Sequence, residues 1–332
     1  SYGNRNAISI NYGGPTDYRV NGATPSGLLV QGNTVTYNNN STPMDGTDDA
    51  GFRAGVATDE SGGTFTLNTF QTINHDILVR FAGSGDVNVT NNNLNGGGVE
   101  LAEHNGGAGN INVTGNTFDG TFGNLAVTPR TAVLRLKNNQ QNKVTVVSGN
   151  TFNNHLWAIS LENYKNVSID DNDFTPLASS TDYVHIGVNT KSISSNSSTI
   201  VQTAVDGAFT KNVFNGSGVA GGTGIGFYNH DSDNATFGTF TIGTTGNENE
   251  FNAQIAQFIR LDNQTGSTDP ATVPTDYPNT GTWPTTMACW NQNYDIQNNK
   301  FDVGSGLQFP FAMNFANRTG LEGKLFHKPE DT

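Results

Sequence analysis

The stretch from Trp157 to Phe174 reads WAISLENYKNVSIDDNDF and holds two short runs of alternating apolar residues. The first run is Ala158-Ile159-Ser160-Leu161, the second is Val167-Ser168-Ile169, and an asparagine follows each run. Alternation of apolar and polar residues is typical of a strand that buries one face. The stretch therefore predicts two strands joined by a short corner, and the chain repeats this arrangement.

The pattern apolar-x-x-Asn-x-Phe, with small variations, recurs in nine copies along the chain. The shortest spacings between successive copies are 22 to 24 residues, and the longer ones are 34 to 50 residues. A fixed period of this length is typical of repeat architectures. The asparagines of the nine copies are Asn33, Asn68, Asn92, Asn116, Asn150, Asn172, Asn212, Asn249 and Asn299.

A second strand pattern follows each copy, as in GVELAEHN, AVLRLKNN and AISLENYK. A unit of 22 to 24 residues with two clear strands and a short third one corresponds to one turn of a parallel β-coil. We therefore predict an all-β, single-stranded parallel β-helix of about nine to ten turns, stacked roughly 4.8 Å apart. The second pattern carries its own asparagine series: Asn138, Asn163, Asn229, Asn263 and Asn317.

The repeated asparagine and phenylalanine have clear roles in such a coil. Asparagine tolerates left-handed backbone at a sharp corner. Its amide can also bond to the same asparagine one turn above and below. The phenylalanine two residues later can point inward and stack on its counterparts. We expect one asparagine ladder and one phenylalanine stack along the coil.

The composition agrees with a coil that has a thin core. Hydrophobic residues make up 34% of the 332 residues, and 40 residues are glycine. Disorder would also give a low apolar fraction, but it should lack the regularly spaced Val, Ile and Phe found here. The single cysteine, Cys289, excludes an internal disulfide and is interpreted as a buried small hydrophobe.

The net charge of −13, with only 16 Lys and Arg, argues against a nucleic-acid partner. We expect no membrane span, because the chain has no apolar run of 18 residues. An acidic, soluble surface favours an extracellular or cell-surface location. The chain starts within the repeat pattern, which suggests a processed chain or a segment of a longer protein.

The alternation of AISLEN with VSIDDNDF and INVTGNTF resembles the right-handed parallel β-helix repeat of pectate-lyase-like proteins. It is most similar in style to the giant β-strand-repeat surface proteins of bacteria. The resemblance covers about residues 7 to 318 and implies the fold. That superfamily includes polysaccharide lyases, glycosidases, epimerases, tailspikes and adhesins. No catalytic signature of a lyase or epimerase carries over to this sequence residue by residue.

The chain is predicted to be one β-helix over residues 1–318, with a cap or linker over 319–332. Loop insertions are expected near residues 36–50, 119–130, 175–206 and 264–292. Insertions that leave at one corner would form a wall beside the second-strand face, and such a groove suits an extended ligand. Corners also tolerate insertions without any function, so both interpretations stay open.

Outward positions of the second strands hold the densest set of reactive groups. We expect one column of Arg53, Arg80, Glu100, Arg135, Ser160, His185, Gly226, Arg260 and Asn314. The next column is Ala102, Lys137, Glu162, Gly187, Tyr228, Asp262 and Ala316. Ion pairs are expected between Glu100 and Arg135 and between Lys137 and Glu162. A lyase or hydrolase would draw its groups from this face. The catalytic candidates are Arg135, Lys137, Glu162, His185, Tyr228, His230 and Asp262, and a purely structural surface is the alternative.

Ligand and metal candidates lie in the loops. Trp283 and Trp290 could stack on sugar rings or anchor their loop to the coil. No cofactor is certain. Calcium could bind Asp45, Asp48 and Asp49 or Asp231 and Asp233, because close carboxylates suit this ion.

The leading hypothesis is a non-catalytic structural or adhesive rod that contacts polysaccharide or other cell-surface material. The second is a polysaccharide lyase or glycoside hydrolase acting in a groove on the second-strand face. The third is a self-associating filament subunit, because an uncapped coil end is an open sheet edge.

Overall fold

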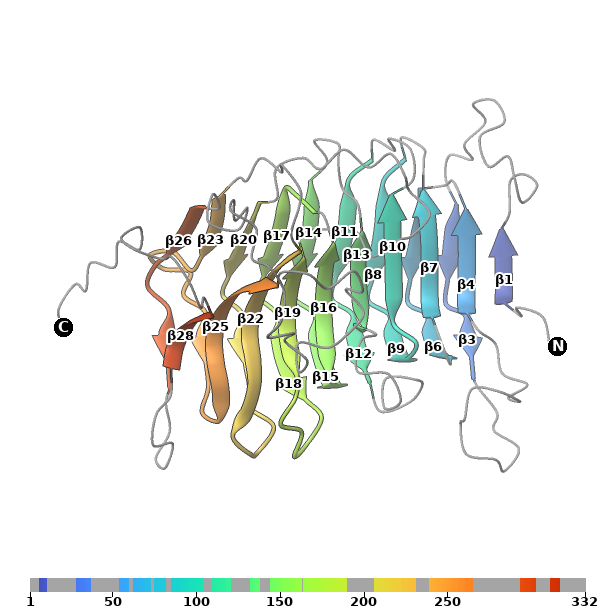
Figure 1. Cartoon of the computed structure of the whole chain (residues 1–332). Helices are drawn as coiled ribbons and strands as arrows, with labels where there is room; N and C mark the ends of the chain where they lie inside the picture. Colours follow the sequence, from blue (N-terminus) through green and yellow to red (C-terminus); the bar gives the residue numbers. More distant parts are fainter. Residues whose placement is uncertain are drawn as a thin grey trace.

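The computed structural model of the chain describes residues 6–10, 28–36, 54–59, 62–72, 75–81, 85–103, 109–120, 132–137, 144–162, 164–189, 206–230, 239–264, 293–302 and 311–316. These residues form strands, turns and bends but no helix, and the strands stand side by side in one long stack (Figure 1). The predicted all-β class is confirmed.

The strands belong to three sheets, which we name A, B and C. Sheet A contains β1 (Asn6–Ile10), β4 (Ala54–Asp59), β7 (His75–Phe81), β10 (Val99–Glu103), β13 (Leu134–Lys137), β16 (Trp157–Glu162), β19 (Val184–Asn189), β22 (Gly221–His230), β25 (Ile255–Gln264) and β28 (Phe311–Ala316). Sheet B contains β2 (Leu29–Gln31), β5 (Gly63–Thr66), β8 (Val87–Thr90), β11 (Ile111–Thr114), β14 (Thr145–Ser148), β17 (Val167–Asp170), β20 (Gly207–Thr210), β23 (Thr239–Ile242) and β26 (Asn293–Ile296). Sheet C contains β3 (Thr34–Val35), β6 (Thr69–Thr72), β9 (Asn93–Gly96), β12 (Thr117–Asp119), β15 (Thr151–His155), β18 (Asp173–Pro176), β21 (Val213–Phe214), β24 (Glu250–Phe251) and β27 (Lys300–Phe301).

Each turn of the chain passes through sheets B, C and A in the same order. Every strand is hydrogen-bonded to the strand three places further along, as β11 is to β14, and all these pairs are parallel. A chain that winds through three parallel sheets in this way is a parallel β-helix. The ten strands of sheet A and nine strands of sheets B and C confirm the predicted number of turns.

The core fills the inside of the coil along its length. On sheet B, five successive strands from β5 to β17 share one pattern of a buried residue followed by a half-buried one. On sheet C, the predicted phenylalanines stack, with Leu94 in the series between Phe70 and Phe118. Ring centroids of neighbouring pairs from Phe118 to Phe301 are 4.6, 4.9, 5.0, 4.6 and 5.1 Å apart.

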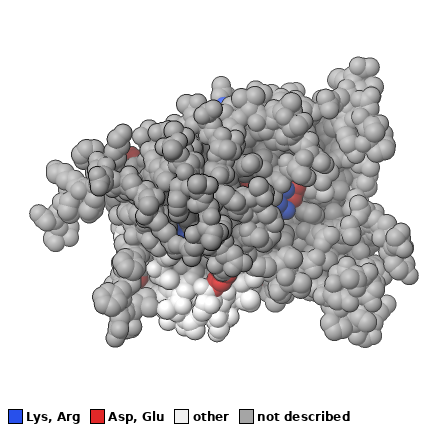
Figure 2. Space-filling view, viewed as in Figure 1, with Lys and Arg blue, Asp and Glu red and all other residues white. Residues whose placement is uncertain are grey.

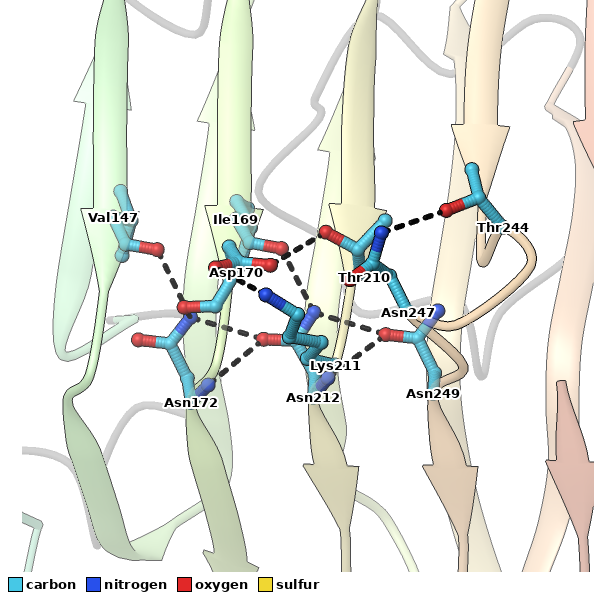
Figure 3. Close-up of polar contacts among 10 residues, drawn as sticks. All are labelled: Val147, Ile169, Asp170, Asn172, Thr210, Lys211, Asn212, Thr244, Asn247 and Asn249. Atoms are coloured by element: carbon cyan, nitrogen blue, oxygen red, sulfur yellow. Dashed lines mark hydrogen bonds and ion pairs between the residues drawn. The ribbon is translucent and has the colours of Figure 1, made fainter.

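The asparagine ladder runs along the corner between sheets B and C (Figure 3). The backbone N–H of Asn116 and its Nδ2 both donate to Oδ1 of Asn150, at 2.9 and 3.0 Å. Its Nδ2 also donates to the Val89 carbonyl at 2.8 Å, and its Oδ1 accepts from Asn92. The Asn116 side chain therefore satisfies its polar groups although the residue is only 1% exposed.

The residue before the ladder asparagine makes the corner bend. Its φ lies between 51° and 67° before every ladder asparagine except Asn249. The ladder asparagines themselves do not have positive φ, so the expectation that they hold the left-handed position was wrong. The bend precedes the asparagine, which then turns its amide into the coil. The left-handed residues are Gly32, Leu67, Asn91, Gly115, Gly149, Asp171, Lys211 and Asn298.

The predicted insertions fall mostly outside the described residues. This holds for most of 36–50 and 119–130 and for nearly all of 264–292, and it also holds for the cap or linker at 319–332. Within 175–206, the structure describes a turn in which the Ser180 N–H donates to the Leu177 carbonyl at 3.1 Å, followed by β19. The domain boundaries stay a prediction.

Candidate functional site

The outer face of sheet A brings together part of the predicted set. The register aligns Glu100, Arg135 and Ser160 on β10, β13 and β16, as predicted. It also aligns Lys137 with Glu162 and Tyr228 with Asp262. Because neighbouring strands are about 4.8 Å apart, aligned side chains on this face can touch.

Two residues stand in a different column from the predicted one. Arg80 pairs with Ala102, not with Glu100. Gly187 pairs with Ser160, not with Glu162, whose partner on β19 is Asn189. Counting residues from the repeat pattern misplaced them by two positions, because the corners before β7 and β19 differ in length. Arg53 lies outside the described residues.

His185 was predicted to face solvent on sheet A, and that prediction was wrong. The residue is 0% exposed and lies inside the coil, where its ring centroid is 5.7 Å from that of Phe174 and 5.5 Å from that of Phe214. The β16–β19 pairing has no partner for His185, since it passes from Trp157–Val184 to Ile159–Ile186. An irregular start of the strand thus turns this side chain inward, away from the outer face.

Four charged side chains form a network on the outer face. Arg135 Nη1 lies 3.2 Å from Glu100 Oε2, and its Nη2 lies 3.4 Å from Glu162 Oε1. Lys137 Nζ lies 3.1 Å from Glu100 Oε1. The predicted Glu100–Arg135 pair is confirmed, while the described partner of Lys137 is Glu100. We call these four residues the outer ion network.

The outer ion network is more buried than an ordinary surface pair. The Glu162 side chain is 1% exposed, those of Glu100 and Lys137 about a tenth, and that of Arg135 20%. Buried charges are tolerated when they are paired and hydrogen-bonded, and removing one partner is costly. With two acids and two bases, the network has a formal charge of zero. It can orient hydroxyl groups through hydrogen bonds, but it carries no cationic excess.

Trp157 also belongs to this face, and sequence reasoning did not select it. A Cβ atom added to Gly187 would lie 2.5 Å from Cζ3 and 3.1 Å from Cε3 of Trp157, so the indole lies over that glycine. The residue is half-buried and begins the strand that carries Ser160 and Glu162. The signal that could have found it is the combination of a tryptophan at the start of one strand, Trp157, and a glycine in the next strand of the sheet, Gly187.

Figure 2, viewed as in Figure 1, shows only a few blue and red atoms among the described residues of this side, with one small patch where the two colours adjoin. Among the coloured residues of this side, charge is therefore local and of both signs. No extended field of one sign is seen among the residues coloured there.

The remaining candidates are placed only in part. Tyr228 and His230 lie on β22 and Asp262 lies on β25, with Tyr228 opposite Asp262. The two loop tryptophans and the five proposed calcium ligands lie outside the described residues: Trp283, Trp290, Asp45, Asp48, Asp49, Asp231 and Asp233. Those ligand and metal assignments stay predictions. Of the second asparagine series, Asn229 and Asn263 pair in register on β22 and β25.

Two features are absent from the described residues. They contain no group of three or more His, Cys, Asp or Glu that could hold a metal ion. Over the same part of the chain, no helix is long and apolar enough to cross a membrane.

Comparison with known proteins gives no relative for this chain: no family model, no curated protein and no solved structure matches it.

Proposed function

We propose that this chain is a rigid β-helical module of an extracellular or cell-surface protein, and that it serves as a structural or adhesive rod. The observation that carries the proposal is the unbroken asparagine ladder from Asn33 to Asn299. Neighbouring turns are tied together by the same amide hydrogen bond, which is buried in all but the first and last links, so the coil resists bending at any one turn. The acidic composition and the resemblance to bacterial β-strand-repeat proteins support the location.

The rod contacts carbohydrate on the outer face of sheet A, at a patch formed by Trp157, Ser160 and the outer ion network. An indole offers an apolar plane for a sugar ring, and the neighbouring polar groups offer hydrogen bonds. Because the network has a formal charge of zero, it suits a neutral sugar better than a uronate. A uronate would need an additional cation.

The test is a glycan array followed by affinity measurements on the purified chain. We expect binding to a neutral glycan, and we expect Trp157→Ala to weaken it at least tenfold. The matched control is Leu67→Ala, which removes an apolar side chain that is 56% exposed at the corner between sheets B and C. Binding only to anionic glycans, or equal losses in both variants, would reject the patch. Cleavage of a polysaccharide at enzymatic turnover would reject the non-catalytic rod.

An enzyme acting on the same face is the second candidate, and the burial of Glu162 favours it. A carboxylate with 1% side-chain exposure next to a guanidinium is an arrangement that active sites also use. Turnover of a polysaccharide that disappears in Glu162→Gln, with binding retained, would support this candidate. Unchanged turnover in Glu162→Gln would remove Glu162 from the catalytic set.

Self-association into a filament is the third candidate. The outermost strands of sheet A in the described part of the chain, β1 and β28, each have one described partner in that sheet, and an open sheet edge can pair with a second copy. Sedimentation over a wide concentration range tests this directly, and a monomer at every concentration would contradict it.

A further inference from the structure

Two histidines face each other inside the coil, at the corner between sheets C and A. His155 ends β15 and His185 lies near the start of β19, and both are 0% exposed. The distance from His155 Nε2 to His185 Nδ1 is 2.8 Å, which is a hydrogen bond. One ring donates its N–H and the other accepts it, so the accepting ring is neutral, and the pair can hold at most one extra proton while this bond persists.

The surroundings of the pair are aromatic. The ring centroid of His185 is 5.1 Å from that of Tyr183, and the ring centroid of His155 is 6.3 Å from that of Phe174. Three buried polar atoms here have no hydrogen-bond partner of ordinary geometry: His155 Nδ1, His185 Nε2 and the Tyr183 hydroxyl. Backbone groups of Phe152, Asn215 and Ser217 lie beside these three residues. Poorly paired buried polar atoms cost free energy and mark a site that is not optimised for stability alone.

No acid among the described residues is placed to balance a charge on this pair. The acids on the elements around it belong to outer faces or exposed turns: Asp119, Glu162, Asp173 and Asp182. Asp119 accepts from Asn154 Nδ2 at 3.0 Å, and Glu162 is held by Arg135. Burial lowers the pKa of His155 to about 3, against a smaller opposing effect of the Phe152 carbonyl. Burial, followed by the neighbouring His155, also lowers the pKa of His185.

The corner segment Leu177–Tyr183 joins β18 to β19 and holds Tyr183 against the pair. Its N-terminal end is tied to the pair, because the Leu177 N–H donates to the His155 carbonyl at 3.0 Å. Ser179 has a φ of 62°, which is unfavourable for a residue other than glycine. Most of its residues before Tyr183 are exposed. The segment is held to the next turn by hydrogen bonds from the Ser179 N–H to the Ser217 carbonyl at 2.8 Å and from the Gly222 N–H to the Thr181 carbonyl at 2.9 Å, and opening breaks these bonds.

We propose that the His155–His185 pair is an acid-sensitive latch, and that proton uptake by the pair releases the corner segment Leu177–Tyr183 while the asparagine ladder keeps the turns together. The released state exposes the rings to water, where an imidazole takes up a proton at its ordinary pKa of about 6.5. Each pH unit below that value then favours opening by roughly tenfold for each proton taken up. This inference concerns the corner alone and does not depend on the proposed function.

The test is hydrogen exchange of the intact chain, read at segments 177–183 and 215–220. The second segment is the corresponding corner one turn later, and it contains no histidine. After correction for intrinsic exchange, we expect protection of 177–183 to fall at least tenfold between pH 7 and pH 5. Protection of 215–220 should change much less. Equal protection of 177–183 at both pH values would overturn the proposal, whatever the variants do.

Two variants assign the effect to the histidines. The double variant His155→Gln and His185→Gln keeps polar side chains but removes both titrating groups, and the pH dependence at 177–183 should disappear. Asp182→Asn is the matched control, because it removes an exposed acid of the same segment, and the dependence should persist. Persistence in the double variant, or loss in Asp182→Asn, would place the proton elsewhere and reject the latch.

Discussion

Leu67 holds a left-handed backbone conformation, with a φ of 57°, directly before Asn68, which is 1% exposed inside the corner. Leu67 makes the bend, and the buried side-chain amide of Asn68 forms hydrogen bonds with the neighbouring turns. Glycine takes the strained position in some turns, whereas this turn uses leucine, which is 56% exposed. The fold therefore tolerates leucine in this unfavourable backbone conformation directly before a ladder asparagine.

Replacing Leu67 by glycine should stabilise the chain. The left-handed conformation costs a residue other than glycine about 1 kcal/mol, and little packing is lost at an exposed side chain. Urea unfolding should show a gain of that size. Gly149→Ala is the matched control in the opposite direction, because Gly149 has a φ of 64° and no other atom would lie within 4 Å of the added Cβ. A loss of stability in Leu67→Gly would contradict this account of the corner.

Asp76 makes the stability of the early turns depend on pH. It is fully buried and accepts from Thr72 Oγ1 at 2.9 Å and from the Gly98 N–H at 3.0 Å. Burial raises its pKa from 3.8 to about 8, against the smaller opposing effect of these hydrogen bonds. The folded state thus binds a proton that the unfolded state releases near pH 4. The stabilising contribution is fully present below about pH 4 and is lost as the pH rises through about 8.

The contribution of Asp76 to stability should therefore fall between pH 5 and about pH 8, by at most about 1.4 kcal/mol per pH unit. Asp76→Asn cannot titrate and should flatten this profile. Urea unfolding at pH 5, 7 and 9 provides the measurement, and the difference between wild type and Asp76→Asn separates this carboxyl from the two histidines, which both proteins contain. Parallel profiles for wild type and Asp76→Asn would show that this carboxyl does not control the slope.

Arg135 is predicted to be the most costly side chain of the outer ion network to remove. Its guanidinium is shared by Glu100 and Glu162, and their side chains are 9% and 1% exposed. Arg135→Ala should lower the free energy of unfolding by about 3 kcal/mol, because it takes one partner from two buried charges. Lys300→Ala removes a partner from Glu250 at 2.7 Å in an exposed pair and should leave the unfolding midpoint unchanged. Equal losses of stability in Arg135→Ala and Lys300→Ala would contradict the prediction that a buried ion network contributes more to stability than an exposed ion pair.

The repeated elements of the fold could be predicted from the sequence because their residues serve the same purpose in every turn. The asparagine spacing identified the ladder, and the phenylalanine two residues later identified the stack. The aligned pairs Glu100–Arg135 and Lys137–Glu162 followed from the same register. The register of a solenoid can be predicted from its repeat, because each turn contacts only its neighbours.

The irregular elements could not be predicted, because they depend on how a corner closes in three dimensions. His185 fits the outward alternation of its strand, yet the irregular start of β19 turns it inward toward His155. Gly187 was assigned to the wrong column because the corner between β18 and β19 is longer than the corner between β15 and β16. Trp157 lies over Gly187 only because the register brings them together, and no sequence pattern states that register.

The central claim is that the corner asparagines hold the coil together, and one pair of variants tests it most directly. Asn112 and Asn116 lie four residues apart in the same turn. Asn112 is half-buried on the outer face of sheet B, where its Nδ2 donates to Asn88 Oδ1 at 2.8 Å. Asn116 is 1% exposed within the ladder.

Asn116→Ala should lower the free energy of unfolding by about 3 kcal/mol or more, because it leaves the buried Asn92 donors and the Val89 carbonyl without their partner. Asn112→Ala should cost less than about 1 kcal/mol. Urea unfolding of the two variants side by side is the decisive measurement. A large difference in this direction is the predicted result, and equal losses for Asn112→Ala and Asn116→Ala would contradict the account.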